Sequence, residues 1–188
     1  MLHFVALLAA ATVPVDAQSA MLSAFKDVCV KQQTLEELTD RAAQRGWKPY
    51  QNGSDSPLAH EFELVAPMLE QQGLASDVSF FKSGGDVHFE LVVTLTRKPI
   101  SGGQKLIGCS MYNLDALTPI ENSALEAVAG PKGGIRSTAG DIQVEKWDGI
   151  LGPNSGMRAV FVPKDSPYGA QLGFTGMMLG IHFLEGSK

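Results

Sequence analysis

The alternation of apolar and polar residues between positions 87 and 97 constrains the fold of this chain more than any other feature. Every second residue is apolar, a period typical of a strand with one face in the core: Phe89, Leu91, Val93 and Leu95. The glycine-rich sequences at 83–86 and 101–103 flank this segment and are typical of turns. With apolar segments at 78–81 and 105–111, the pattern predicts an antiparallel meander over 78–112.

Helices are predicted from their end signals. Thr34-Leu35-Glu36-Glu37 is a capping box, and Gly46-Trp47 is typical of a helix C-terminus, so a helix is predicted over 35–45. Thr118-Pro119-Ile120-Glu121 is a second capping box, and it predicts a helix that runs to about Ala129 and stops at Gly130-Pro131. A third helix is indicated near Cys29 by apolar residues at helical spacing: Met21, Leu22, Phe25 and Val28.

The other segments complete an α+β pattern. We expect a strand at 60–65, a short helix at 67–73 and a glycine-containing loop at 132–140. Three strands are expected at the end of the chain, namely 141–147, 157–162 and 172–184. Because strands follow one another without βαβ repetition, the sequence predicts one domain over 18–188. We expect an antiparallel sheet of about five to seven strands, two or three helices packed on it and one disulfide.

The first residues are typical of a secretory signal peptide. Residues 2–13 are almost wholly apolar, yet they are too few to cross a bilayer, which takes about 20 residues. Val15 and Ala17 are small residues at the positions that signal peptidases prefer, so residues 1–17 are predicted to be removed before Gln18. The segment before this run lacks Lys and Arg, and a buried N-terminal helix is the alternative. We see no transmembrane segment in the predicted mature chain, and we expect a periplasmic or secreted protein.

Two cysteines are present, and an exported chain usually pairs them. Both Cys29 and Cys109 lie among apolar neighbours, so we predict a disulfide that closes a loop of roughly 80 residues. The chain-entropy model gives such a bond about 4.5 kcal/mol at most. A catalytic thiol is the alternative, but neither cysteine has a histidine near it in the sequence.

Composition excludes one class of partner. The 15 basic residues are outnumbered by 20 acidic ones, which gives a net charge of −5 without any basic run. Proteins that bind nucleic acids or anionic membranes usually carry a basic patch. We therefore expect no nucleic-acid partner.

The first candidate polar site is formed by His88 and Glu90. In a strand these two side chains point to the same side, where they could share a proton or a metal ion. His60 and His182 would join them only if their strands align. The alternative is an ordinary solvated strand face, and the histidines lack the spacing of metal ligands, so no metal and no cofactor are predicted.

The second candidate is the glycine-rich segment 130–140, whose backbone amides could hold an anion. Its polar residues are Lys132, Arg136, Ser137 and Thr138. The segment does not match the Walker A pattern, and it leaves a helix rather than entering one, so an ordinary surface loop is the alternative. No G-x-S-x-G motif exists in the chain. Met177 and Met178 could line an apolar ligand pocket, or they belong to the core.

Two short motifs resemble a known group of proteins. Phe25-x-x-x-Cys29 and Ala42-Ala43-x-x-Gly46-Trp47 resemble the N-terminal region of small exported proteins of Gram-negative bacteria that have no assigned activity. The resemblance covers about 30 residues and implies bacterial export and a disulfide. It transfers no site residues.

These observations predict a soluble binding or interaction protein of the bacterial envelope rather than a catalyst. Its partner would be an envelope protein or a small apolar ligand. The alternative is a small periplasmic enzyme that uses His88 and Glu90 as acid and base or as metal ligands.

Overall fold

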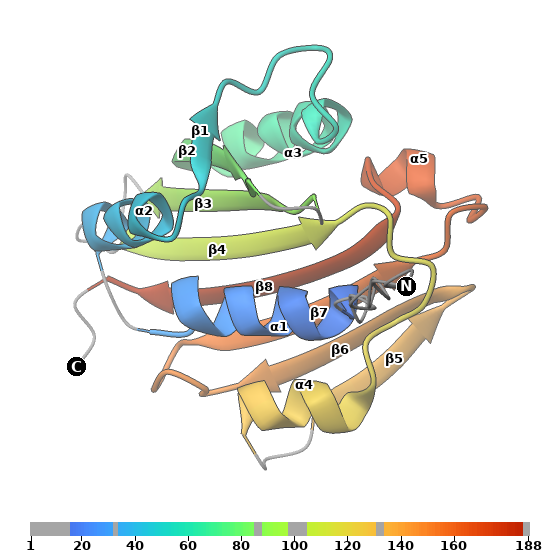
Figure 1. Ribbon diagram of the computed structural model, residues 1–188. Coiled ribbons are helices and arrows are strands. Elements are labelled where there is room, and N and C mark those ends of the chain that lie inside the picture. Colours follow the sequence, from blue (N-terminus) through green and yellow to red (C-terminus); the bar gives the residue numbers. More distant parts are fainter. Residues whose placement is uncertain (1–15, 32–33, 85–87, 98–104, 131–133, 186–188) are drawn as a thin grey trace, which may run out of the picture.

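The computed structural model describes residues 16–31, 34–84, 88–97, 105–130 and 134–185, and these form one large antiparallel sheet (Figure 1). Along the sheet the strand order is β1-β2-β3-β4-β8-β7-β6-β5. The last strand therefore lies between β4 and β7 and joins two meanders. The strands are β1 (Lys48–Tyr50), β2 (Ala75–Lys82), β3 (Glu90–Arg97), β4 (Lys105–Asn113), β5 (Ile135–Ala139), β6 (Ile142–Asp148), β7 (Gly156–Val162) and β8 (Gly176–Leu184).

The α+β class and the antiparallel sheet are confirmed, but the predicted number of strands is wrong. Over the described ranges the sheet has eight strands, not five to seven. Two strands were not predicted: β1, which has three residues and contains Pro49, and β5, which lies in the segment predicted to be a loop. Both are edge strands, which pair on one side only and therefore need a weaker strand pattern.

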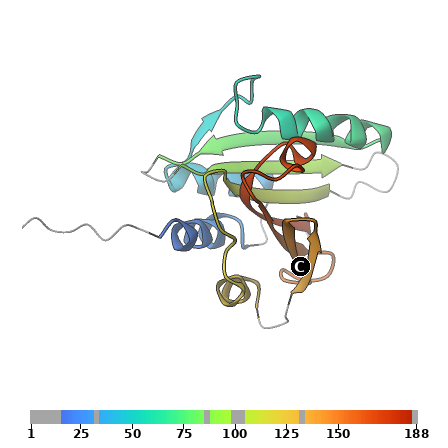
Figure 2. The same ribbon diagram turned by 90° about the vertical axis from the view of Figure 1, so that its right-hand side faces the viewer.

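The described residues form five helices, where two or three were predicted: α1 (Ala17–Val28), α2 (Leu35–Gln44), α3 (Ala59–Gln71), α4 (Asn122–Ala129) and α5 (Gly169–Leu172). Figures 1 and 2 show α1, α2 and α4 on one face of the sheet and α3 on the other. We call these the α1 face and the α3 face. None of the described helices is long and apolar enough to cross a membrane.

Helix α3 replaces the predicted strand at 60–65 and absorbs the predicted helix at 67–73. Alternation over only six residues does not distinguish a strand from a helix. The longer spacing of Leu58, Phe62, Val65 and Leu69 is helical, and this spacing decides the structure. Pro67 lies inside the helix.

The capping box of α2 is confirmed. The Thr34 hydroxyl accepts a hydrogen bond from the Glu37 amide at 3.2 Å, and the Glu37 carboxylate accepts one from the Thr34 amide at 2.7 Å. Gly46 has a φ of 82°, and the Trp47 amide donates to the Ala42 carbonyl at 3.0 Å. The predicted C-terminal signal therefore ends this helix.

The second predicted capping box is wrong. Helix α4 begins at Asn122, and its N-cap Glu121 makes no capping bond with its side chain. The Thr118 hydroxyl instead accepts a hydrogen bond from the Gln18 side-chain amide at 2.9 Å, and Ile120 is buried in the core. Tertiary contacts of residues 118–120 have thus overridden the local motif.

The α1 face holds the larger core. Met21, Phe25 and Val28 of α1 are fully buried at helical spacing against the sheet. Cys29 follows as the C-cap of α1 and forms the predicted disulfide with Cys109 in the middle of β4, with 5.6 Å between their Cα atoms. Both cysteines are fully buried. A disulfide of this kind is typical of a protein that folds in an oxidising compartment outside the cytoplasm.

The start of α1 also bears on the predicted signal peptide. Residues 1–15 lie outside the described residues. Asp16 is the N-cap of α1 and accepts a hydrogen bond from the Gln18 amide at 3.1 Å. The predicted cleavage before Gln18 would therefore cut within the first turn of the helix.

Candidate ligand-binding site on the α3 face

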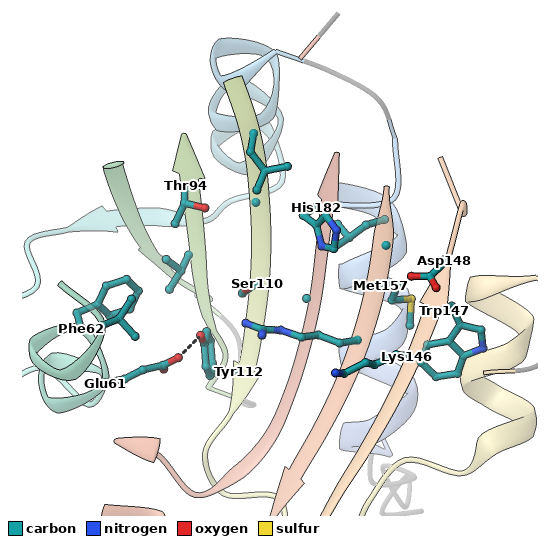
Figure 3. Close-up of a pocket in the computed structure, with 18 residues that line it drawn as sticks. Glu61, Phe62, Thr94, Ser110, Tyr112, Lys146, Trp147, Asp148, Met157 and His182 are labelled. Atoms are coloured by element: carbon teal, nitrogen blue, oxygen red, sulfur yellow. Dashed lines mark hydrogen bonds between the residues drawn. The ribbon is translucent and has the colours of Figure 1, made fainter. Parts of the chain in front are cut away.

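A hollow of about 470 Å³ opens on the α3 face over the middle of the sheet (Figure 3). Its floor lacks large side chains because three glycines lie at its centre. Gly108 is on β4, Gly180 on β8 and Gly156 on β7, and all three line the hollow. The β-sheet register places these glycines in two neighbouring rows across the sheet.

The first row contains His182, whose register partners are Gly108 and Gly156. A Cβ atom at Gly156 would lie 2.8 Å from Cε1 of His182, so the imidazole occupies the space that a larger residue would need. A Cβ atom at Gly108 would collide with the Thr94 hydroxyl. The two glycines therefore allow a histidine ring and a hydroxyl group to lie close to the floor of the hollow.

The second row contains two positive charges. Arg158 on β7 is the register partner of Lys146 on β6 and of Gly180 on β8, and Gly180 is the partner of Ser110 on β4. Arg158 and Lys146 are both exposed, and no ion pair among the described residues involves either of them. Like charges directly opposite each other on neighbouring strands destabilise a sheet.

Glu61 of α3 lies at the opposite wall of the hollow. The Tyr112 hydroxyl donates a hydrogen bond to the Glu61 Oε1 at 2.9 Å (Figure 3). The Glu61 Oε2 is buried and has no hydrogen-bond partner in the part of the chain that the structure describes. Burial raises the pKa of Glu61 to about 7, although the Tyr112 hydrogen bond and the charge of Arg158 both oppose this shift. Glu61 is thus a carboxyl group that titrates near neutral pH.

His182 and Asp148 complete the polar lining. Burial lowers the pKa of His182, and the charge of Arg158 lowers it further, whereas the charge of Asp148 raises it. The imidazole is therefore mainly neutral at neutral pH. The Ser110 side chain hydrogen-bonds that of Tyr112, and this bond opposes the rise that burial causes in the pKa of Tyr112.

A second hollow of about 480 Å³ lies between α3 and the sheet, next to the first. The two hollows share Phe62, Val65 and Thr94 as lining residues. The second lining is mostly apolar and includes Phe62, Val65, Leu69, Leu74, Val78 and Phe80. A polar hollow and an apolar hollow therefore adjoin each other on the α3 face.

Helix α3 is attached mainly at its N-terminal end. Leu58, just before the helix, is fully buried, and the His60 ring hydrogen-bonds the Ala170 carbonyl of α5 at 2.9 Å. Gly173 has a φ of 79° and lies so close to Glu61 that any side chain there would collide with the α3 backbone. The helix itself contains no buried residue, and Met68 is 58 % exposed.

The structure places the predicted His88–Glu90 pair apart from the other two histidines. His88 precedes β3, exerts a charge effect on the pKa of Glu90, and lines a separate hollow beside Asp16 and Asn113. Burial raises the pKa of Glu90. His60 lies on α3 and His182 lies in the central hollow, so neither joins His88. The described residues contain no group of three or more side chains suited to hold a metal ion.

The predicted anion loop is largely a strand. Lys132 lies outside the described residues, whereas Arg136, Ser137 and Thr138 belong to the edge strand β5. The Arg136 side chain donates to the Glu145 carboxylate on the neighbouring strand, with Nε at 2.7 Å from Oε1. The prediction of a loop is therefore wrong for residues 135–139, and Arg136 is already paired. Met177 and Met178 are buried on opposite faces of the sheet and belong to its two cores.

Sequence reasoning missed the groups that line the central hollow, namely Glu61, Tyr112, Lys146 and Arg158. Lys146 and Arg158 each lie in a strand among apolar residues. They are neighbours only because of the register between β6 and β7, which cannot be predicted from the sequence. No family model, curated protein or solved structure matches this chain. The function is therefore argued from the geometry of the site alone.

Proposed function

We propose that the protein binds a small amphipathic molecule on the α3 face and does not catalyse a reaction. One observation carries this proposal: α3 covers an apolar hollow that adjoins a polar, partly charged hollow. A ligand with an apolar part and a polar part would match the two hollows. Their volumes fall within the range of roughly 300–1,000 Å³ that is common for small-molecule sites.

The weak packing of α3 supports this proposal. A helix that serves only to complete a core buries an apolar stripe, but α3 buries no residue of its own. Leu64, Val65 and Met68 are large apolar residues that stay exposed. An apolar ligand between α3 and β2 would remove further apolar surface from water, which is favourable by about 25 cal/mol per Å².

The cellular setting is part of the same proposal. The apolar segment 2–13 and the residues before Gln18 are typical of a signal peptide, and the buried disulfide fits an oxidising compartment. We therefore place the binding protein in the periplasm or outside the cell. The ligand would be a molecule present in the envelope or the surrounding medium.

A substitution that fills the apolar hollow tests the proposal. Val78 is half-buried on β2 and lines this hollow, so Val78→Trp is expected to reduce the affinity for decanol, a neutral amphiphile, by roughly tenfold or more. Met68→Trp adds the same side chain to the exposed surface of α3 and is the matched control. Binding is measured by isothermal titration calorimetry, and circular dichroism reports whether each variant is folded.

Two results would contradict the proposal. Decanol that does not bind the unmodified protein excludes an amphiphile site under α3, and equal affinities of the two tryptophan variants place any binding elsewhere. If Val78→Trp does not fold, Leu69→Ala provides the same test, because it removes apolar lining from the hollow.

A further inference from the structure

We infer that the polar hollow on the α3 face holds a singly charged carboxylate headgroup between Lys146 and Arg158. The inference rests on the proposed function and names the chemical class of its ligand. The ligand would be a carboxylic acid with an apolar chain, such as a fatty acid. Its carboxylate would lie over Gly180 and its chain would extend beneath α3.

The first reason is the unfavourable arrangement of the two cations. Lys146 and Arg158 are register partners on the same face, and neither forms an ion pair with a described carboxylate, although the charge of Arg158 acts on the pKa of Glu61. An anion placed between them would convert a repulsive pair into two attractive contacts. Figure 3 shows the Lys146 side chain pointing from β6 toward the centre of the sheet, where this anion would lie.

The second reason is the close approach of polar groups beside Arg158. A Cβ atom at Gly180 would lie 3.1 Å from the Ser110 hydroxyl oxygen, 3.2 Å from Met178 Sδ and 3.6 Å from Arg158 Cγ. The glycine therefore allows the stem of a guanidinium group and a hydroxyl group to lie close together at the floor of the hollow. Guanidinium groups bind planar carboxylates through two parallel hydrogen bonds, and a hydroxyl group supplies a third donor.

The third reason concerns the charge of the headgroup. Glu61 and Asp148 also line the hollow, one on the α3 side and one on β6. Two acidic groups at the edges of the site oppose a ligand with two negative charges, such as a phosphate monoester. They leave the two central cations suited to one negative charge.

The apolar chain of this ligand would lie in the apolar hollow. Phe62 and Val65 line both hollows, so they mark the passage from the charged part to the apolar part. A fully extended apolar chain that leaves the headgroup above Gly180 would run past these residues toward Leu69 and Phe80.

The experiment compares decanoate with decanol on the complete folded protein at about pH 7.5, where the ligand carboxylate is ionised. We expect decanoate to bind roughly tenfold to hundredfold more tightly than decanol, since a hydrogen bond to a charged group adds this much affinity. Arg158→Gln and Lys146→Gln should each remove most of this advantage, so that decanoate and decanol bind each variant with more nearly equal affinity. Arg158→Lys should retain part of it.

Lys164→Gln provides the control, because Lys164 is exposed in the turn after β7 and does not line either hollow. Equal affinities for decanoate and decanol, or no effect of Arg158→Gln and Lys146→Gln, would overturn the inference while leaving the proposed function intact. Tighter binding of decyl phosphate than of decanoate would overturn the assignment of a single charge. Failure of both decanol and decanoate to bind would overturn the proposed function itself.

Discussion

The two faces of the sheet are built in different ways from the same strands. On the α1 face, three helices bury apolar side chains against the sheet, and a disulfide ties α1 to the central strand β4. On the α3 face, a helix without buried residues stands over two hollows. One face is therefore close-packed, and the other retains the two hollows in which we propose that a ligand binds.

The difference between the two faces arises from the alternation of side chains along the strands. On β4, Ile107, Cys109 and Met111 point to the α1 face and are fully buried, whereas Gly108 and Ser110 point to the α3 face. The alternation of the strand allows large residues on one side and small ones on the other. A single segment thus contributes both to a close-packed core and to the floor of a hollow.

The largest difference between the faces should appear on removal of a phenylalanine. Phe25 is fully buried on the α1 face, so Phe25→Ala is expected to lower the free energy of unfolding by about 3–5 kcal/mol. Phe62 is half-buried beside the hollows, so Phe62→Ala should cost only about 1 kcal/mol. Urea denaturation measures both values. Equal losses would mean that α3 is as well packed as α1, and the contrast between the faces would fail.

Removal of the disulfide should lower the free energy of unfolding almost as much as Phe25→Ala does. The Cys29→Ser and Cys109→Ser double variant is expected to lose about 2–5 kcal/mol, because the bond spans 80 residues and both sulfur atoms are buried. The midpoint of urea denaturation reports the change, with the oxidised parent as the reference. A loss below about 1 kcal/mol would show that the α1 face is held by packing alone.

The α3 face should instead show a pH dependence. Burial raises the pKa of Glu61 from 4.5 to about 7, so the folded protein binds this proton more tightly than the unfolded chain does. The stabilising effect is fully present below about pH 4.5 and is lost as the pH rises through 7. From acid to alkaline pH the loss is on the order of 3 kcal/mol.

Glu61→Gln should remove this part of the pH dependence while keeping an acceptor for the Tyr112 hydroxyl. The stability of the variant and of the parent is compared across this pH range by urea denaturation. Glu63→Gln is the control on the same helix, because Glu63 is exposed. Parallel pH curves for the Glu61 variant and the parent would contradict the raised pKa.

The smallest changes in stability should come from substitutions at the N-termini of the α1-face helices α2 and α4. Glu37→Ala removes one half of the α2 capping box and should cost about 0.5–1 kcal/mol. Glu121→Ala should have almost no effect, because Glu121 makes no capping bond. Thermal unfolding of the two variants separates them. An equal loss at Glu121 would restore the capping box that the sequence predicted for α4.

These cases show which parts of the fold the sequence could predict. The meander over 78–112, helix α2 and the disulfide follow from local signals, and the structure confirms them. The segment 60–65 was predicted wrongly because six residues do not distinguish the period of a strand from that of a helix. Edge strand β5 was missed because its residues are exposed and carry no apolar alternation.

The candidate site was harder to predict than the fold, for a reason that lies in the register. His182, Lys146 and Arg158 come from three different strands, and only the pairing of β8 with β7 and of β7 with β6 brings them together. A shift of one residue in either pairing would turn the side chains of one strand to the other face. His88 and Glu90 were selected because they are close in sequence, which needs no register.

The position of β8 has a consequence for how the chain reaches its final state. Strand β8 lies between β4 and β7, so the two meanders remain separate until residues 176–184 have been synthesised and have paired with both strands. Until then each meander has an unpaired apolar edge strand, and such strands can pair with other chains and aggregate. Gly180 and His182 arrive with this strand as well. The folding step that closes the sheet is therefore also the step that creates the proposed ligand site.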